Sequence, residues 1–307
     1  MKAWLAHPDG PALLGEVPPG VTVEVVTDPQ APPSDPAGVT FWTPPYLVSS
    51  PEWTAFAGTL PDVRVVQLLT AGADAWLGRI PPTALLCDAQ GVHDAPTADW
   101  AVTATLAWLR RFDHFARAQG RGEWAHSAHT PTDELTGKRV LVVGAGAIGT
   151  KIGARLAPFE VSLTYVARHA RPGVHAVAAL PALLPAHDVV ILVVPLTTAT
   201  RGLVDDAFLA AMPDGALLVN AARGPVVDTD ALVRALSGGR IGAALDVTDP
   251  EPLPAGHPLW TLPGVLLTPH VAGAVGGMMR RAYDLVGAQL RRHAAGAPLA
   301  NVVHGDY

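Results

Sequence analysis

The chain has 307 residues, of which 49% are hydrophobic and 16% are charged. This composition excludes wholesale disorder, and the length suggests two domains at roughly 100 to 200 residues each. The net charge of −6 and the isoelectric point near 6.0 give no electrostatic reason to expect a nucleic acid or an anionic membrane as a partner.

Three features concern the compartment of the protein. Cys87 is the single cysteine, so no intrachain disulfide can form, and we expect it to be a buried apolar residue. Pro8 and Gly10 interrupt the N-terminus before an apolar signal segment develops. The longest strongly apolar run, 189–194, is far shorter than the roughly 20 residues that cross a bilayer. The sequence therefore predicts a cytoplasmic protein.

The N-terminal third is predicted to be a small α/β domain. Prolines crowd the stretch 29–61 and fix short turns, so regular structure there should be brief. On either side of it, 21–26 and 63–69 are rich in β-branched and aliphatic residues, which is typical of strands.

An amphipathic helix is predicted over 99–115. Its apolar residues recur at spacings of three and four, at Val102, Leu106, Leu109 and Phe112. The stretch that follows, 117–136, is polar.

Six aliphatic runs then predict the strands of a second domain. The runs are 140–143, 161–166, 189–194, 216–219, 241–245 and 265–267. They are almost continuously hydrophobic, as parallel strands are when helices cover both faces of their sheet. Helices are predicted over 147–156, which Pro158 stops, and from the capping residue Asp228 through Leu236, which Gly238 would end. Strands that alternate with helices indicate a doubly wound fold, and a last helix is predicted over 275–292.

A glycine loop joins the first of these strands to its helix. The sequence from Gly144 to Gly149 is G-x-G-x-x-G, the pattern of dinucleotide-binding Rossmann folds. Gly144 permits a tight turn, Gly146 lets the backbone approach a pyrophosphate, and Gly149 lets the helix pack on the strand. A glycine-rich turn without a ligand is the alternative, but the strand, loop and helix together favour dinucleotide binding.

The end of the next strand indicates which dinucleotide binds. An NAD enzyme usually presents Asp or Glu there to the ribose 2′-hydroxyl, whereas this chain has Ala167. Arg168, His169 and Arg171 follow it, and their cations suit a 2′-phosphate. The alternative is that the two arginines are ordinary surface residues at a strand end and bind no phosphate. The sequence favours NADP(H), with NAD(H) as the second choice.

Three later strand ends each carry one residue suited to reduction of a 2-keto acid. His270 could donate a proton to the oxygen that gains charge when a hydride reaches the carbonyl carbon. Glu251 could orient the imidazole and favour its protonated form. Arg223 could hold a substrate carboxylate by two hydrogen bonds. Each residue alone has an ordinary structural explanation, so their joint position carries the hypothesis.

Several segments carry a resemblance to a known family: 144–149 (GAGAIG), 194–197 (VPLT) with Thr200, 218–224 (LVNAARG), 245–252 (LDVTDPEP) and 268–273 (TPHVAG). On these motifs the chain resembles the D-isomer-specific 2-hydroxyacid dehydrogenases over nearly its whole length. The resemblance implies that Arg223, Glu251 and His270 are the catalytic residues. It also implies a substrate loop at 69–74 (LTAGAD), where the backbone amides of Ala71 and Gly72 meet the carboxylate together with Arg223.

The same resemblance implies a set of cofactor contacts, with Asp246 near the nicotinamide carboxamide. The set is Gly144, Gly146, Ala147, Ile148, Gly149, Arg168, His169, Arg171, Pro195, Thr200, Ala222, Asp246 and Gly273. Residues 165–172 (YVARHARP) are most similar to the NADP-using glyoxylate and hydroxypyruvate reductases, which also lack the acidic residue.

The family resemblance further implies a discontinuous layout. A Rossmann nucleotide domain, 99–274, is inserted into a smaller flavodoxin-like α/β substrate domain, 1–98 with 275–307. Hinge helices would begin at Asp99, where the family commonly has Glu, and at Val275. A homodimer joined through the nucleotide domains is implied, with 117–136 as an arm.

Some residues and functions stay open at this point. The N-terminal domain is too short and proline-rich for specificity-setting side chains to be placed by matching. His93 lies towards the substrate side in the family layout, but a packed or solvated histidine explains it equally well. A dinucleotide-sensing, corepressor-like protein of the same fold is the alternative function. A formate or phosphite enzyme is disfavoured, because the formate enzymes pair the histidine with Gln rather than with a residue like Glu251.

Overall fold

The two ends of the chain form one structural unit, and the middle of the chain forms another. The computed structural model describes residues 1–47, 50–127 and 130–305. Unit 1 consists of Met1–His93 and the C-terminal segment that begins at Val275, and unit 2 is Asp94–Ala274. The first boundary lies after His93 instead of before Asp99, because the helix that opens unit 2 begins at Asp94.

Unit 1 contains a parallel sheet of five strands. The strands are β1 (Lys2–Leu5), β2 (Thr22–Val25), β3 (Val39–Thr43), β4 (Val65–Gln67) and β5 (Leu85–Cys87), and the helices are α1 (Gly10–Leu13), α2 (Pro51–Ala57) and α9 (Met278–Ala294). The strand order is β2-β1-β3-β4-β5, and the paired strands are parallel. This is the flavodoxin order, as predicted for the substrate domain.

Helices cover both faces of the unit 1 sheet. In β1, Ala3 and Leu5 belong to an apolar cluster that includes Tyr283 of α9. Between them, Trp4 points to the opposite face and packs in a cluster with Trp53 of α2. Cys87, at the end of β5, is buried, as predicted.

Unit 2 contains a parallel sheet of seven strands in the order β12-β11-β10-β9-β6-β7-β8. The strands are β6 (Arg139–Val143), β7 (Ser162–Ala167), β8 (Val174–Ala176), β9 (Val189–Leu192), β10 (Leu217–Asn220), β11 (Gly242–Leu245) and β12 (Val265–Leu267). The helices are α3 (Asp94–Leu109), α4 (Phe112–Gly120), α5 (Ala147–Leu156), α6 (Leu180–Leu183), α7 (Asp206–Ala211) and α8 (Thr229–Ser237). Short 3-10 turns are η1 (Ala157–Phe159), η2 (Val177–Ala179), η3 (Leu184–Ala186), η4 (Gly224–Val226) and η5 (Pro258–Trp260).

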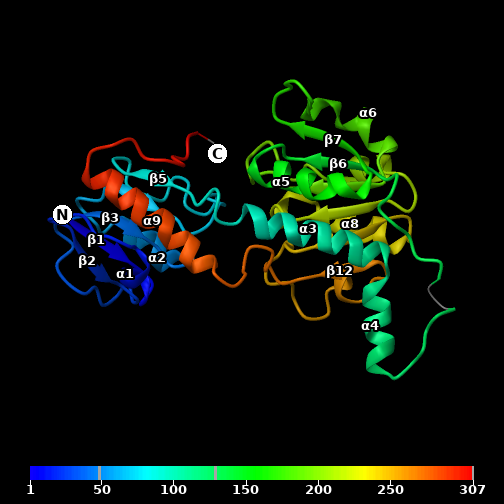
Figure 1. Cartoon of the computed structure of the whole chain (residues 1–307), viewed down its shortest axis with the longest axis horizontal. Coiled ribbons are helices and arrows are strands. Elements are labelled where there is room, and N and C mark those ends of the chain that lie inside the picture. The colour runs from blue at the N-terminus through cyan, green and yellow to red at the C-terminus, as the bar shows by residue number, and fades with distance from the viewer. Residues whose placement is uncertain (48–49, 128–129, 306–307) are drawn as a thin grey trace. The chain divides into compact units, whose positions relative to one another are not determined.

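The two faces of this second sheet bury alternate residues of each strand. In β6, Val140 and Val142 belong to a cluster with Ile152 of α5, on the face that α3 and α5 cover (Figure 1). Leu141 belongs to the other cluster, with Leu232 of α8. Burial on both faces explains why the strands are almost continuously hydrophobic, and it confirms the predicted doubly wound fold.

Most predicted elements of unit 2 are found at the predicted places. Helix α5 has the predicted bounds, and α8 begins after Asp228, whose carboxylate accepts the N–H of Ala231 at 3.0 Å. Gly238 follows its last residue, Ser237. Helix α9 begins at Met278 rather than at the predicted position 275.

The single helix predicted over 99–115 is wrong. The structure has two helices, α3 and α4, and Arg111 between them has a left-handed backbone with φ 54°. The apolar spacing continues across this break, but the burial does not. Leu109 is buried, whereas Phe112 is 61% exposed, because α4 leaves the sheet (Figure 1). Strands β1, β3, β5 and β8 were not predicted from the sequence. No helix among the described residues is long and apolar enough to span a membrane.

Candidate active site

The glycine loop between β6 and α5 has the shape that its sequence predicts. Gly144 has φ +118°, and a Cβ there would lie 2.6 Å from the carbonyl oxygen of Val193. A Cβ on Gly149 would lie 1.9 Å from the carbonyl oxygen of Gly144. Gly146 is different, since nothing lies within 4 Å of its Cβ position. A bulky, charged group can therefore approach the start of α5 at Gly146.

A cavity of about 320 Å³ opens beside this loop. It is lined by Val143, Gly144, Ala145, Gly146, Val166, Ala167, Arg168, Arg171, Val177, Val193, Val194, Pro195, Thr197, Ala199, Thr200 and Leu203. The lining brings together the loop, both arginines, and the predicted contacts Pro195 and Thr200. His169 is exposed and does not line the cavity. The open Gly146 position and this adjoining cavity fit a dinucleotide.

Arg171 contacts the glycine loop directly. Its Nη2 donates a hydrogen bond to the carbonyl oxygen of Ala145 at 2.7 Å. Another part of the lining is a closed turn, in which the hydroxyl of Thr200 donates to the carbonyl oxygen of Pro195 at 2.6 Å and accepts the N–H of Thr197 at 2.8 Å. Hydrogen bonds thus fix both of these parts of the lining.

Arg223 lies in a braced turn after β10. Asn220, which is buried at the end of β10, accepts the N–H of Ala222 at 3.0 Å and donates to the carbonyl of Arg223 at 3.1 Å. The next residue, Gly224, packs so tightly that a Cβ there would lie 1.9 Å from the carbonyl oxygen of Thr248. Because Thr248 follows β11, this contact ties two neighbouring strand ends together.

The side chain and main-chain groups of Ala222 are already engaged within the protein. Its side chain is buried, its N–H bonds to Asn220, and its carbonyl accepts Nη1 of Arg223 at 2.8 Å. Its cofactor contact stays a prediction, as do those of Ala147, Ile148 and Gly273.

His270 occupies a strained turn after β12. Its φ is 54°, a left-handed conformation that is costly for a residue other than glycine. Asp246, buried after β11, holds this turn. Its carboxylate accepts the hydroxyl of Thr268 at 2.6 Å and the N–H groups of Val271 and Ala272, both at 2.9 Å. Sequence reasoning placed Asp246 beside the nicotinamide and did not find this role; its cofactor contact stays a prediction.

Glu251 orients the imidazole of His270. Its Oε1 lies 2.6 Å from Nδ1 of His270. A carboxylate only accepts, so Nδ1 carries the proton of this bond and Nε2 is the nitrogen available for exchange with a substrate. Burial alone would raise the pKa of Glu251. The hydrogen bond and charge of His270, a backbone hydrogen bond at Thr248 and the charge of Arg223 outweigh it and hold the pKa below its ordinary value.

The three proposed catalytic residues share one edge of the unit 2 sheet. Strands β10, β11 and β12 are neighbours and parallel, so the residues after them meet at the carboxyl edge, as does the glycine loop after β6. Arg223, Glu251 and His270 follow these three strands in turn. The charge of Arg223 acts on Glu251, and Glu251 is bonded to His270. Such a site can bind an anion and move a proton beside it.

The predicted substrate loop, 69–74, lies in unit 1 and follows β4. The hydroxyl of Thr70 donates to the carbonyl of Gly72 at 2.9 Å, and the N–H of Ala89 donates to the carbonyl of Thr70 at 2.9 Å. His93 is a packed histidine, because its side chain is buried and bonded to the loop.

Comparisons with known proteins decide the family. The family described as "D-isomer specific 2-hydroxyacid dehydrogenase, NAD binding domain" matches residues 102–272, more than half of the chain. The chain belongs to the D-isomer-specific 2-hydroxyacid dehydrogenases. This confirms the predicted family and makes the chain an NAD(P)-dependent oxidoreductase, with unit 2 carrying the nucleotide-binding fold.

Individual members of this family are similar over different lengths. A glyoxylate reductase of Thermofilum pendens is 38% identical over 210 residues, which is 65% of this chain and 62% of that enzyme. A family member from Xanthobacter autotrophicus, solved with NADPH and MES, has 30% identity and a TM-score of 0.84 over 99% of this chain and 98% of that one. An NADPH-dependent glyoxylate/hydroxypyruvate reductase of Sinorhizobium meliloti has 26% identity and a TM-score of 0.84, with 98% of each chain covered.

Proposed function

We propose that this dehydrogenase uses NADPH to reduce a small 2-keto acid, of the glyoxylate or hydroxypyruvate type, to a D-2-hydroxy acid. The observation that carries the proposal is the bond of 2.6 Å between Glu251 and His270, on the sheet edge that also holds Arg223 and the glycine loop. In this proposal unit 2 binds the cofactor, and unit 1 contributes the amides of Ala71 and Gly72 to the substrate carboxylate.

Each catalytic residue has a defined chemical task. NADPH, when bound, supplies a hydride to the carbonyl carbon. Arg223 binds the substrate carboxylate and polarises the carbonyl, so the oxygen can accept negative charge. His270 gives the proton on Nε2 to that oxygen, which completes the hydroxyl group and leaves a neutral imidazole. Glu251 holds Nδ1, keeps the ring in place and stabilises the protonated ring before the transfer.

The preference for NADPH rests on the end of β7. Ala167 stands where an acidic side chain would repel a 2′-phosphate, and Arg168, the next residue, lines the cavity beside the glycine loop. The solved relatives from Xanthobacter autotrophicus and Sinorhizobium meliloti hold NADPH and NADP, which supports the same cofactor here.

The test is a cofactor oxidation assay with NADPH and NADH on glyoxylate, hydroxypyruvate, pyruvate, ketopantoate and bulkier keto acids. We expect turnover of a small keto acid with NADPH, and a product of the D configuration on a chiral column where the acid formed is chiral. Replacing His270 by Ala should lower kcat at least about a hundredfold, the lower range for general acid catalysis. The exposed His175 supplies the control, since His175→Ala should keep full activity. No turnover across the panel would overturn the proposal.

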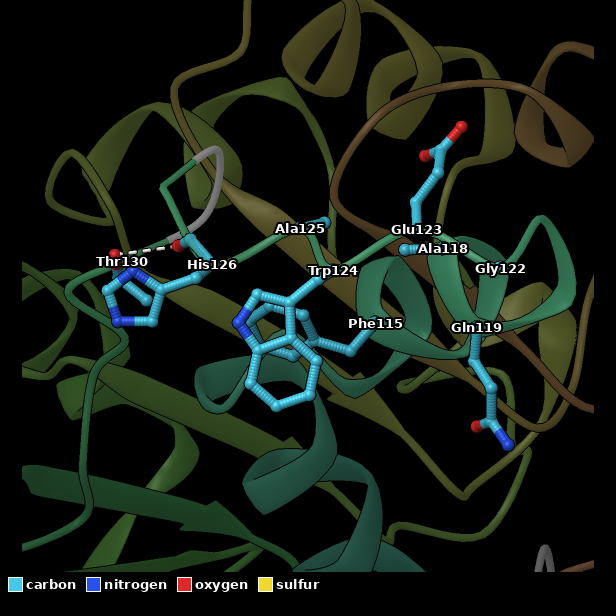
Figure 2. Close-up of a pocket in the computed structure, with 9 residues that line it drawn as sticks. All are labelled: Phe115, Ala118, Gln119, Gly122, Glu123, Trp124, Ala125, His126 and Thr130. Atoms are coloured by element: carbon cyan, nitrogen blue, oxygen red, sulfur yellow. Dashed lines mark hydrogen bonds between the residues drawn. The ribbon is translucent and has the colours of Figure 1, made fainter.

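We also propose that the protein is a homodimer that uses the segment from α4 onward as its arm. Trp124 is 96% exposed, and α4 buries only Ala118 of its nine residues. A cavity of about 560 Å³ lies along this segment, lined by Phe115, Ala118, Gln119, Gly122, Glu123, Trp124, Ala125, His126 and Thr130 (Figure 2). An almost fully exposed tryptophan beside an apolar cavity is typical of a surface that another protein covers. Positions 128 and 129 of the predicted arm lie outside the described residues.

A further inference from the structure

The carbonyl groups of the predicted substrate loop are held inside unit 1 by hydrogen bonds. Gln67, which is buried at the end of β4, donates from Nε2 to the carbonyl of Leu68 at 2.9 Å. Nε2 of His93 lies 2.7 Å from the carbonyl oxygen of Leu69. The next carbonyl, that of Thr70, accepts the N–H of Ala89 at 2.9 Å. Three successive carbonyls, one just before the loop and the first two of the loop itself, are therefore fixed from within the unit.

These bonds set the direction of the loop amides. A trans peptide group is planar, so a carbonyl oxygen and the N–H of the following residue point in opposite directions. The carbonyl of Thr70 points towards Ala89, and the N–H of Ala71 consequently points away from it. His93 fixes the peptide plane just before this one through Leu69. Together the two bonds limit the rotation that would turn the amide of Ala71 away.

The imidazole of His93 is itself held in place. Its side chain is 7% exposed, and its ring stacks on that of Tyr46, with centroids 5.8 Å apart and an interplanar angle of 15°. A carbonyl oxygen cannot donate, so Nε2 of His93 must carry the proton of the bond to Leu69. The preceding residue, Val92, accepts Nε of Arg281 at its carbonyl, at 3.3 Å, which ties this segment to α9.

We propose that His93 is a positioning residue for the substrate: by holding the carbonyl of Leu69 it fixes the 69–74 loop, whose amides bind the substrate carboxylate. This inference rests on the proposed function. It assigns His93 no contact with the reacting atoms, and so predicts an effect on substrate binding rather than on hydride transfer.

Two variants separate the hydrogen bond from the packing. His93→Phe keeps a ring against Tyr46 and removes the donor, which leaves a buried carbonyl without its partner. His93→Gln retains an amide donor that can reach the position of Nε2. His293 provides a matched control in the same unit, since its Nε2 lies 3.0 Å from the hydroxyl of Thr40 and its ring lies 6.0 Å from that of Phe41. His293→Phe removes a histidine hydrogen bond to a hydroxyl group, away from the loop.

The variants are compared by keto acid kinetics and by NADPH binding. We expect His93→Phe to raise KM for the keto acid about tenfold, which corresponds to about 1.4 kcal/mol. Its kcat should change less than about threefold, and its Kd for NADPH should not change, because the loop does not move the proton. His93→Gln should restore KM to within about threefold of the wild type, and His293→Phe should leave KM unchanged.

Amide hydrogen exchange of the 69–74 peptide gives a readout that needs no turnover. Exchange there should be faster in His93→Phe than in the wild type or in His293→Phe, because the bond that holds Leu69 is missing. An unchanged KM with unchanged exchange in His93→Phe would overturn the inference, and so would a KM in His93→Gln as high as that of the Phe variant. A wild type that reduces no keto acid would instead overturn the proposed function, and with it the substrate role of His93.

Discussion

The main-chain N–H of His270 donates to the main-chain carbonyl of Asp246 at 2.7 Å, so the residue that follows β11 fixes a residue three positions beyond the end of β12. The side chain of Asp246 adds hydrogen bonds to Thr268, Val271 and Ala272 on both sides of His270. A left-handed histidine persists only where its surroundings impose it. We infer that Asp246 is what supports this conformation.

The variant Asp246→Asn tests this support. An amide has one acceptor oxygen and an NH₂ group, so at least one of the three donors loses its partner. We expect the free energy of unfolding to fall by about 1–3 kcal/mol, the cost of an unsatisfied buried group, and kcat to fall about tenfold or more as His270 loses its placement. Urea denaturation and steady-state kinetics measure the two effects. The exposed Asp249 on the same segment is the control, and an Asp246→Asn variant as stable and active as Asp249→Asn would contradict the role.

The pH dependence of stability should reveal the pair of Glu251 and His270. The pKa of Glu251 is lowered from 4.5 in the folded protein, so its ionised form is favoured by folding. A lowered carboxyl pKa gives stabilisation that is complete above the unfolded value and is lost as the pH falls through the folded value. The difference in Tm between the wild type and Glu251→Gln should therefore narrow as the pH falls below about 4.5.

The control for this titration is Glu134→Gln, which removes an exposed carboxylate from the same unit. Its Tm should follow that of the wild type across the whole pH range. If the difference in Tm between the wild type and Glu251→Gln stayed constant down to the lowest pH, the charge of the carboxylate would contribute nothing to the stability of the folded protein.

The two arginines near the glycine loop should differ in their effects on cofactor binding. Arg171 donates a hydrogen bond to the carbonyl of Ala145 and so holds the loop in place. Arg171→Ala should therefore weaken the binding of NADPH and of NADH to the same extent. Arg168 follows Ala167 and lines the cavity, and Arg168→Ala should raise Kd for NADPH at least about tenfold with little effect on NADH, since a hydrogen bond to a charged group contributes about 1.5–3 kcal/mol. Fluorescence titration measures both constants.

His175 serves as the control for the arginine variants. It is exposed and does not line the cavity, so His175→Ala should keep both dissociation constants within about twofold, a change of about 0.4 kcal/mol. If Arg168→Ala lost the same affinity for NADPH as for NADH, the assignment of this residue to the 2′-phosphate would be rejected.

The sequence was most informative where one physical requirement dominates. Strands of unit 2 are buried on both faces, so their apolar runs were visible, and the bounds of α5 followed from its glycine loop and Pro158. The same holds for Arg223, Glu251 and His270, because each follows a strand of this sheet and the carboxyl ends of parallel strands meet.

Other features depend on contacts that spacing does not reveal. The burial of β1 and β5 depends on a helix far along the chain, since Ala3, Leu5 and Cys87 share an apolar cluster with Tyr283 of α9. The break between α3 and α4 at Arg111 could not be predicted, because the apolar residues keep their helical spacing across it. The role of His93 could not be predicted either, since it depends on the carbonyl of Leu69, and nothing in the side-chain pattern marks that carbonyl.

The arm provides the last prediction. Trp124, which lines the cavity of Figure 2, and Phe112, the first residue of α4, are 96% and 61% exposed, and a second chain that covers this segment would bury both aromatic side chains. Tryptophan is enriched among the few interface residues whose truncation costs about 2 kcal/mol or more, so the double variant Phe112→Ser with Trp124→Ser should weaken association at least about thirtyfold. Light scattering should give twice 31.9 kDa for the wild type and 31.9 kDa for the double variant.

Trp260 supplies the matched control for this experiment. It is also an exposed tryptophan of unit 2, at 54%, but it lies in η5, and its indole donates to the carbonyl of Pro254 at 2.9 Å. Trp260→Ser should leave the mass of the assembly unchanged, because this residue lies outside the arm. If Trp260→Ser dissociated the protein while the double variant stayed dimeric, the interface would have to include η5 instead. Dissociation by the double variant alone would assign the contact to α4 and the segment that follows it.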